Sequence, residues 1–94
     1  PHPCGLLASY PNPFNPTTTI SFGISCKAHV NICLYDVRGH ELKVLVDGIY
    51  EKGEFYTTWD GHDDCGRPVV SGVYFARMLI ENHFADARKI VLLR

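Results

Sequence analysis

The chain has 94 residues, of which 46% are hydrophobic and 20% are charged, so it is long enough for one small domain with a thin core. The net charge is −1 and no cluster of Lys and Arg lies among aromatic residues, so we expect no nucleic-acid partner. The apolar runs are far shorter than the roughly 18 residues of a membrane-spanning helix, so we expect no membrane insertion.

Prolines followed by a β-branched run mark the N-terminal region, which reads YPNPFNPTTTISF from Tyr10 to Phe22. Proline fixes φ and has no N–H to donate, so the three prolines of this segment exclude a helix. We expect residues 1–16 to form a rigid, Pro-rich N-terminal segment and residues 17–94 to form the folded domain. One face of the first strand is expected to carry Thr18, Ile20, Phe22 and Ile24.

Segments in which every second residue is hydrophobic recur at spacings of about ten residues along the chain. This pattern predicts an all-β sandwich or barrel. We expect six strands, at residues 17–24, 29–37, 41–47, 54–60, 72–81 and 85–93. The alternation also predicts the core, because side chains two positions apart share a face of a strand. The predicted inward residues are Val30, Ile32, Leu34, Phe55, Thr57, Trp59, Tyr74, Ala76 and Met78.

The turn after Trp59 reads DGHDDCG and carries the carboxylates of Asp60, Asp63 and Asp64. Calcium prefers several oxygen ligands from one flexible loop, so a metal site is one interpretation of this turn. The EF-hand spacing is absent, however, and Asp and Gly are also the residues that a long turn uses for local hydrogen bonds. We favour the turn and expect no cofactor.

Four cysteines in a short chain allow three full pairings. If six strands alternate up and down, Cys4 and Cys65 meet at one end of the sandwich, Cys26 lies at the other end, and Cys33 lies in mid-strand. We therefore expect one disulfide, between Cys4 and Cys65, with Cys33 left free. The alternative is a zinc site at the same end of the sandwich, formed by His2, Cys4, His62 and Cys65.

Four segments, in order along the chain, resemble one known family. They read YPNPFNPTTTISF (10–22), VNICLYDVRGHEL (30–42), WDGHDDCGRPVVSGVYFARM (59–78) and RKIVLLR (88–94). The ordered set is similar to the type IX secretion (Por) C-terminal sorting domain of secreted bacterial proteins, and to its relative in the flagellar hook-capping protein. The resemblance implies a single immunoglobulin-like antiparallel β-sandwich of six to seven strands over residues 1–94. The cysteines depart from the family pattern, as does Arg94, where lysine is commoner.

The resemblance implies a non-catalytic sorting or cell-surface attachment domain that is secreted or held at the bacterial surface. Because the chain begins without Met, we expect a cargo domain and any signal peptide to lie upstream. The expected partner is the outer-membrane secretion machinery, reached through the periplasm, and the expected contact is the last strand, because an exposed edge strand can pair with a receptor by β-augmentation. The candidate recognition residues are Lys89, Ile90, Val91, Leu92, Leu93 and Arg94.

Three other functions are weighed against sorting. The histidines fall at strand ends or turns and no Ser or Cys lies in a nucleophile elbow, so we expect no enzyme. A carbohydrate-binding or adhesive module would be favoured by aromatic side chains that align on one sheet face, and the predicted outward aromatics are Tyr35, Tyr56 and Phe75. A structural domain like that of the hook cap is the other alternative.

Overall fold

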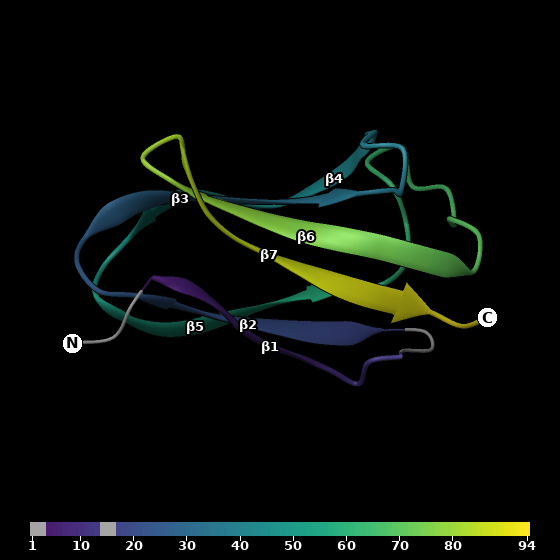
Figure 1. The fold of residues 1–94 in the computed structure, drawn as a ribbon, viewed down its shortest axis with the longest axis horizontal. Helices are drawn as coiled ribbons and strands as arrows, with labels where there is room; N and C mark the ends of the chain where they lie inside the picture. Colours follow the sequence, from purple (N-terminus) through teal and green to yellow (C-terminus); the bar gives the residue numbers. More distant parts are fainter. Residues whose placement is uncertain (1–3, 14–16) are drawn as a thin grey trace.

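The computed structural model describes residues 4–13 and 17–94, which fold into two antiparallel sheets packed face to face (Figure 1). The strands within these ranges are β1 (Gly5–Tyr10), β2 (Thr18–Ile24), β3 (Ala28–Tyr35), β4 (Glu41–Tyr50), β5 (Gly53–Trp59), β6 (Gly72–Ile80) and β7 (His83–Leu92). One sheet has the order β1-β2-β5 and the other the order β4-β3-β6-β7. The expected all-β antiparallel sandwich is confirmed.

The sandwich begins earlier than the sequence indicated, because β1 lies within residues 1–16. This strand pairs with β2 from Gly5 opposite Gly23 to Tyr10 opposite Thr19, with a bulge between Leu6 and Ala8. Leu6 is only 2% exposed and joins the core. The assignment of residues 1–16 to a separate segment was therefore wrong for 5–10, whereas residues 14–16 lie outside the described residues.

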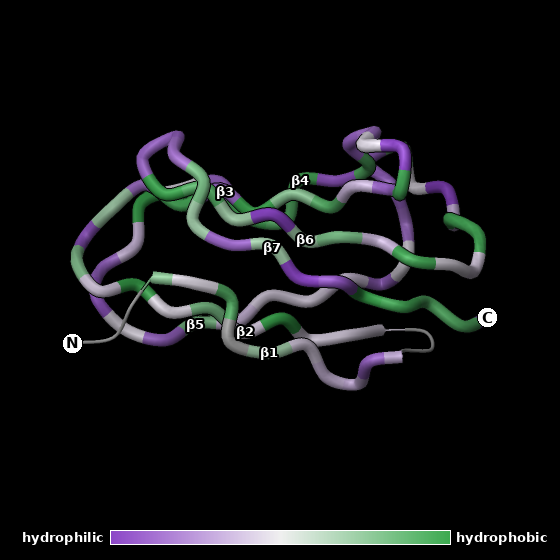
Figure 2. Tube along the Cα trace, in the orientation of Figure 1, coloured by the Kyte–Doolittle hydropathy of each residue, from purple (hydrophilic) through white to green (hydrophobic). Residues whose placement is uncertain are grey.

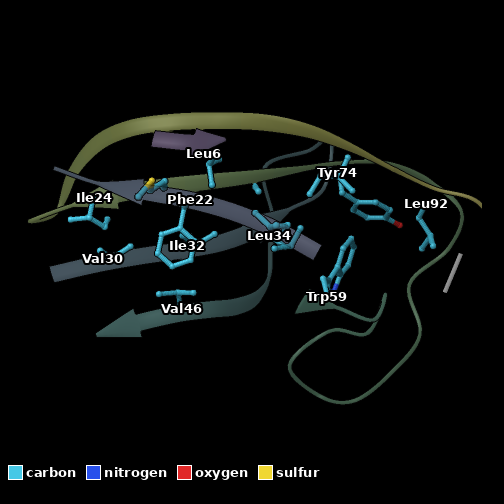
Figure 3. Close-up of a cluster of buried hydrophobic side chains, with 14 residues drawn as sticks. Leu6, Phe22, Ile24, Val30, Ile32, Leu34, Val46, Trp59, Tyr74 and Leu92 are labelled. Carbon is cyan, nitrogen blue, oxygen red and sulfur yellow. The ribbon is translucent and has the colours of Figure 1, made fainter. Parts of the chain in front are cut away.

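The core lies between the two sheets and is built from the inward side chains of all seven strands (Figure 3). The predicted inward residues of β3 and β6 are buried, as is Trp59 at the end of β5, which confirms their register. Phe55 and Thr57 are only partly buried, since β5 is an edge strand. Phe55 still packs against the core, in an aromatic cluster with Phe22 and Tyr50.

The strand directions define two ends of the sandwich. The N-terminal end holds Cys4, the 25–27 turn and the β6–β7 hairpin, and the C-terminal end holds the 36–40 turn, the 60–71 loop and Arg94 (Figure 1). Figure 2 shows that hydrophilic residues gather in the connections, while β7 becomes hydrophobic toward the C-terminus. Among the described residues there is no helix of the length and hydrophobicity needed to cross a bilayer.

Candidate functional site

The terminal strand β7 divides the predicted recognition residues into two faces. Ile90 and Leu92 are fully buried between the sheets. The residues between and after them, Lys89, Val91 and Leu93, alternate to the outer face of the four-stranded sheet, where Lys89 is exposed and Leu93 is 53% exposed. Only this outer set offers side chains to a partner without unfolding the domain.

The free edge of β7 is partly closed by the side chain of Asn12. The Asn12 Nδ2 donates to the Lys89 carbonyl oxygen at 3.1 Å, and the Val91 N–H donates to Asn12 Oδ1 at 2.9 Å. These two bonds occupy one C=O and one N–H of the edge that a receptor strand would pair with. Farther along the strand, the Leu6 N–H donates to Asp86 Oδ2 at 2.9 Å, so β1 is also tied to β7. The predicted β-augmentation at this edge would first have to displace Asn12.

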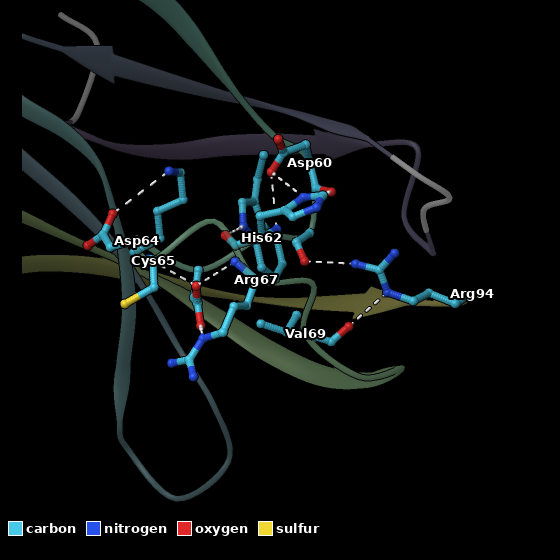
Figure 4. Close-up of polar contacts among 11 residues, drawn as sticks. Asp60, His62, Asp64, Cys65, Arg67, Val69 and Arg94 are labelled. Atoms are coloured by element: carbon cyan, nitrogen blue, oxygen red, sulfur yellow. Dashed lines mark hydrogen bonds and ion pairs between the residues drawn. The ribbon is translucent and has the colours of Figure 1, made fainter.

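Arg94 fastens the end of the chain to the 60–71 loop (Figure 4). Its guanidinium donates to the Val69 carbonyl oxygen at 2.8 Å and to the Gly61 carbonyl oxygen at 2.8 Å. Its backbone N–H donates to Ser71 Oγ at 3.0 Å. A Cβ at Gly61 would lie 2.7 Å from Arg94 Nη2, so the loop and the guanidinium fit closely. The Arg94 side chain therefore has an internal structural role, which sequence alone did not indicate.

The 60–71 loop and the 36–40 turn contain the same local motif, Asp-x-x-Gly-x. Asp36 Oδ1 accepts the N–H groups of residues 38 and 40, and Asp63 Oδ1 accepts those of residues 65 and 67, all at 2.9 Å. Gly39 and Gly66 take the positive φ values, 86° and 79°, that close each turn. These backbone N–H groups hold the pKa of each carboxyl below its usual range. The largest contribution comes from the His40 N–H at Asp36 and from the Arg67 N–H at Asp63.

The three carboxylates proposed as calcium ligands point to different partners. Asp60 Oδ1 accepts the His62 N–H at 3.1 Å, and Asp63 closes its own turn. Asp64 Oδ2 accepts the Val44 N–H at 3.3 Å, which ties the loop to the free edge of β4. Within residues 4–13 and 17–94 there is no group of three or more His, Cys, Asp or Glu placed to hold a metal ion. The geometry thus agrees with a hydrogen-bonded turn.

The predicted disulfide between Cys4 and Cys65 is wrong. β1 runs the length of the sandwich and places Cys4 at the N-terminal end, where its Sγ is 3.2 Å from Ser25 Oγ. Cys65 lies in the 60–71 loop at the C-terminal end, and both side chains are free thiols. The same separation divides Cys4 from His62 and Cys65 in the alternative zinc set. His2, its fourth member, lies outside the described residues.

The outward aromatic side chains fall on both sheets. Tyr35 and Phe75 are paired neighbours on the outer face of the four-stranded sheet, whereas Tyr56 lies on the three-stranded sheet. The Arg77 guanidinium covers the Tyr35 ring, with 4.6 Å between its Cζ and the ring centroid. Burial raises the pKa of the Tyr35 hydroxyl. The three aromatics therefore form no single platform for a sugar ring.

A mainly apolar pocket of about 360 Å³ opens at the C-terminal end, and no sequence motif pointed to it. It lies between the 36–40 turn and the start of β6, and its lining includes Asp36, Val37, Leu42, Val69 and Tyr74. The Tyr74 hydroxyl donates to the Val70 carbonyl oxygen beside it. The 36–40 turn and the 60–71 loop, which form two walls of the pocket, are thus both held by internal hydrogen bonds.

Comparison with solved structures shows the same fold in other bacterial proteins. Latent PorU from Porphyromonas gingivalis superposes with a TM-score of 0.78 at 16% identity, over 94% of this chain and 9% of that one. PorZ, a surface component of the type IX secretion system of the same organism, gives a TM-score of 0.63 at 21% identity, over 93% and 11%. FlgD from P. aeruginosa gives 0.60 at 18% identity, over 96% and 66%. This chain thus spans only about a tenth of PorU or PorZ.

The sequence comparison identifies the family. No curated protein sequence matches the chain. The family model for the secretion system C-terminal sorting domain matches residues 8–93, a span that runs from within β1 past the end of β7. Its match over nearly the whole fold confirms the resemblance that the four sequence segments indicated, and the chain belongs to the secretion system C-terminal sorting domain family.

Proposed function

We propose that the chain is the non-catalytic sorting domain of a larger protein that passes through the periplasm and leaves the cell by a type IX secretion system. The observation that carries the proposal is the match of the sorting-domain family to residues 8–93. The upstream cargo of the same chain and the outer-membrane secretion machinery are then its partners. The cargo ends secreted or attached to the cell surface.

We infer that the secretion machinery contacts the outward side chains of Lys89, Val91 and Leu93. Burial of Ile90 and Leu92 anchors the strand, so these three side chains are held in a row on a rigid surface. Leu93 is a large apolar side chain left 53% exposed, and Lys89 adds a charge beside Phe75. Side-chain recognition on the sheet face requires no change at the edge that Asn12 occupies.

The test is export of the full-length protein, or of a reporter fused upstream of the chain, in a bacterium with a type IX system. Lys89→Glu combined with Leu93→Ser changes the proposed contact and spares the buried residues of β7. The matched control is Lys52→Glu combined with Tyr56→Ser, because both side chains are exposed and Tyr56 lies on the other sheet. We expect the first variant to remain in the periplasm and the control to reach the surface.

Thermal unfolding of both variants separates recognition from folding. Arg94 is left unchanged, because its substitution would free the 60–71 loop, and a folding defect could then be mistaken for a loss of recognition. Surface delivery of the Lys89/Leu93 variant at the normal level would rule out this contact. If the full-length protein were exported equally well after deletion of all 94 residues of this domain, the sorting function itself would be refuted.

The alternatives receive less support. The separation of Tyr56 from Tyr35 and Phe75 argues against a sugar-binding platform. Similarity to FlgD at 18% identity concerns the fold alone.

A further inference from the structure

Two cysteines lie close together at the N-terminal end of the sandwich, although the sequence had placed them at opposite ends. Cys4 Sγ accepts the Ser25 N–H at 3.3 Å and lies 3.2 Å from Ser25 Oγ. Cys26 is the next residue, and its Cα lies about 3.8 Å from that of Ser25. The Cys4 sulfur therefore already contacts the residue that precedes Cys26.

The local structure lets the two thiols approach each other. Cys26 is exposed in the 25–27 bend, outside β2 and β3. Cys4 is half-buried just before β1, where it packs against the rim of the core beside the 25–27 bend. A disulfide needs the two Cα atoms within about 7 Å, and an exposed bend can adjust to meet that limit more readily than a paired strand can.

The other two cysteines do not compete for Cys4. Cys33 is 2% exposed in mid-strand, its thiol donates to Asn31 Oδ1 at 3.1 Å, and burial raises its pKa. Cys65 lies at the C-terminal end. Of the three potential partners, Cys26 is the one in the turn that Cys4 contacts through Ser25.

We propose that Cys4 and Cys26 form a disulfide that ties the start of β1 to the β2–β3 turn. The oxidant is a protein or small-molecule disulfide. One thiolate attacks a sulfur of the oxidant to give a mixed disulfide, and the second thiolate then displaces the oxidant's sulfur. The two steps release the two sulfurs of the oxidant in turn as thiols, so the cysteine pair loses two electrons and two protons and the oxidant gains them. Export would supply the oxidising compartment, but the chemistry itself does not depend on the proposed function.

The bond would close a loop that contains both β1 and β2. β1 holds the β7 edge through Leu6 and is followed by Asn12, which caps the same edge. Fixing the start of β1 would therefore stabilise the closed edge of the sandwich.

The purified 94-residue chain is incubated with oxidised glutathione, its free thiols are alkylated, and it is digested without reductant. No Lys or Arg precedes Lys27, so trypsin leaves Cys4 and Cys26 on one peptide. Chymotrypsin, which cuts after Phe22, then separates two fragments that stay linked if the disulfide is present. We expect this linked pair, with Cys33 and Cys65 alkylated, and a Tm that falls by roughly 10 °C on reduction.

Matched cysteine variants decide the assignment. Cys26→Ser should abolish both the linked fragments and the effect of reductant on Tm, whereas Cys65→Ser should retain both. Alkylation of Cys4 and Cys26 in the oxidised chain, linkage of Cys4 to Cys65 or to a second chain, or an unchanged Tm response in Cys26→Ser would each overturn the proposal. None of these outcomes depends on secretion.

Discussion

At the scale of single residues, Asp36 and Asp63 show what the acidic residues of this chain do. Each carboxylate binds two backbone N–H groups of its own turn, and each lies beside a basic side chain four residues on, His40 or Arg67. The same five-residue motif thus builds both large turns of the C-terminal end. The sequence showed the acidic residues but not which atoms they bind, and the structure shows that these atoms are backbone N–H groups.

These turns predict a loss of stability in acid. Because the folded-state pKa of Asp36 and of Asp63 is lowered, their contribution is present above the unfolded-state pKa and is lost as the pH falls through the folded-state value. We expect the free energy of unfolding to decrease below about pH 4, measured by denaturant melts at a series of pH values. Asp36→Asn with Asp63→Asn keeps an oxygen acceptor in each turn but cannot titrate.

This double variant should show a flatter pH profile than the parent chain. An identical profile in the variant and the parent would mean that other carboxyl groups cause the acid sensitivity.

At the scale of strands, the four-stranded sheet has both of its edges capped by side chains from other segments. Asn12 bonds the edge of β7, and Asp64 accepts the Val44 N–H on the edge of β4. Unpaired strand edges promote association with other chains, and polar side chains that satisfy the edge groups reduce this tendency. Asn12, the asparagine of the YPNPF segment, therefore has a structural role as a cap on the edge of β7.

Removal of the Asn12 cap should loosen β7 locally. Asn12→Ala deletes both bonds to the strand, and we expect it to cost about 1 kcal/mol of unfolding free energy and to speed hydrogen exchange at the Val91 amide. Ser9→Ala is the matched control, because the Ser9 hydroxyl bonds the same Asn12 amide but not β7. Unchanged protection of Val91 in Asn12→Ala would contradict a capping role.

Most strands were predictable because they are rich in β-branched and aromatic residues that alternate with polar ones over most of their length. β1 was missed for physical reasons: GLLASY contains Gly, Ala and Ser, which have little strand preference, and a bulge breaks its alternation. This single omission reversed the end at which Cys4 lies. The error in the disulfide therefore followed directly from the error in the strand.

At the scale of the whole molecule, the family and its fold were predictable, but the surroundings of the proposed recognition residues were not. Which of residues 89–94 are buried follows from alternation along β7. The capping of the β7 edge and the internal bonds of Arg94 depend on segments far apart in sequence, 12 against 89 and 61 against 94. Long-range contacts of this kind leave no periodic signal in the chain.

Trp59 connects the core to the C-terminal end, so its removal should affect the entire fold. Its ring is 1% exposed and packs edge-on against Tyr74 with 5.4 Å between centroids, while its Nε1 donates to the His62 carbonyl oxygen at 2.9 Å. Trp59→Ala leaves a large cavity between the sheets and releases the 60–71 loop. We expect a loss of about 3–5 kcal/mol in denaturant melts.

Thr58→Ala, an exposed neighbour on the same strand, is the control and should stay within about 1 kcal/mol of the parent chain. A domain of this size has a total stability of only about 5–15 kcal/mol, so the Trp59 variant should be partly unfolded at physiological temperature. A loss below about 1 kcal/mol would show that the two sheets are held together mainly elsewhere, at the Phe22 end of the core.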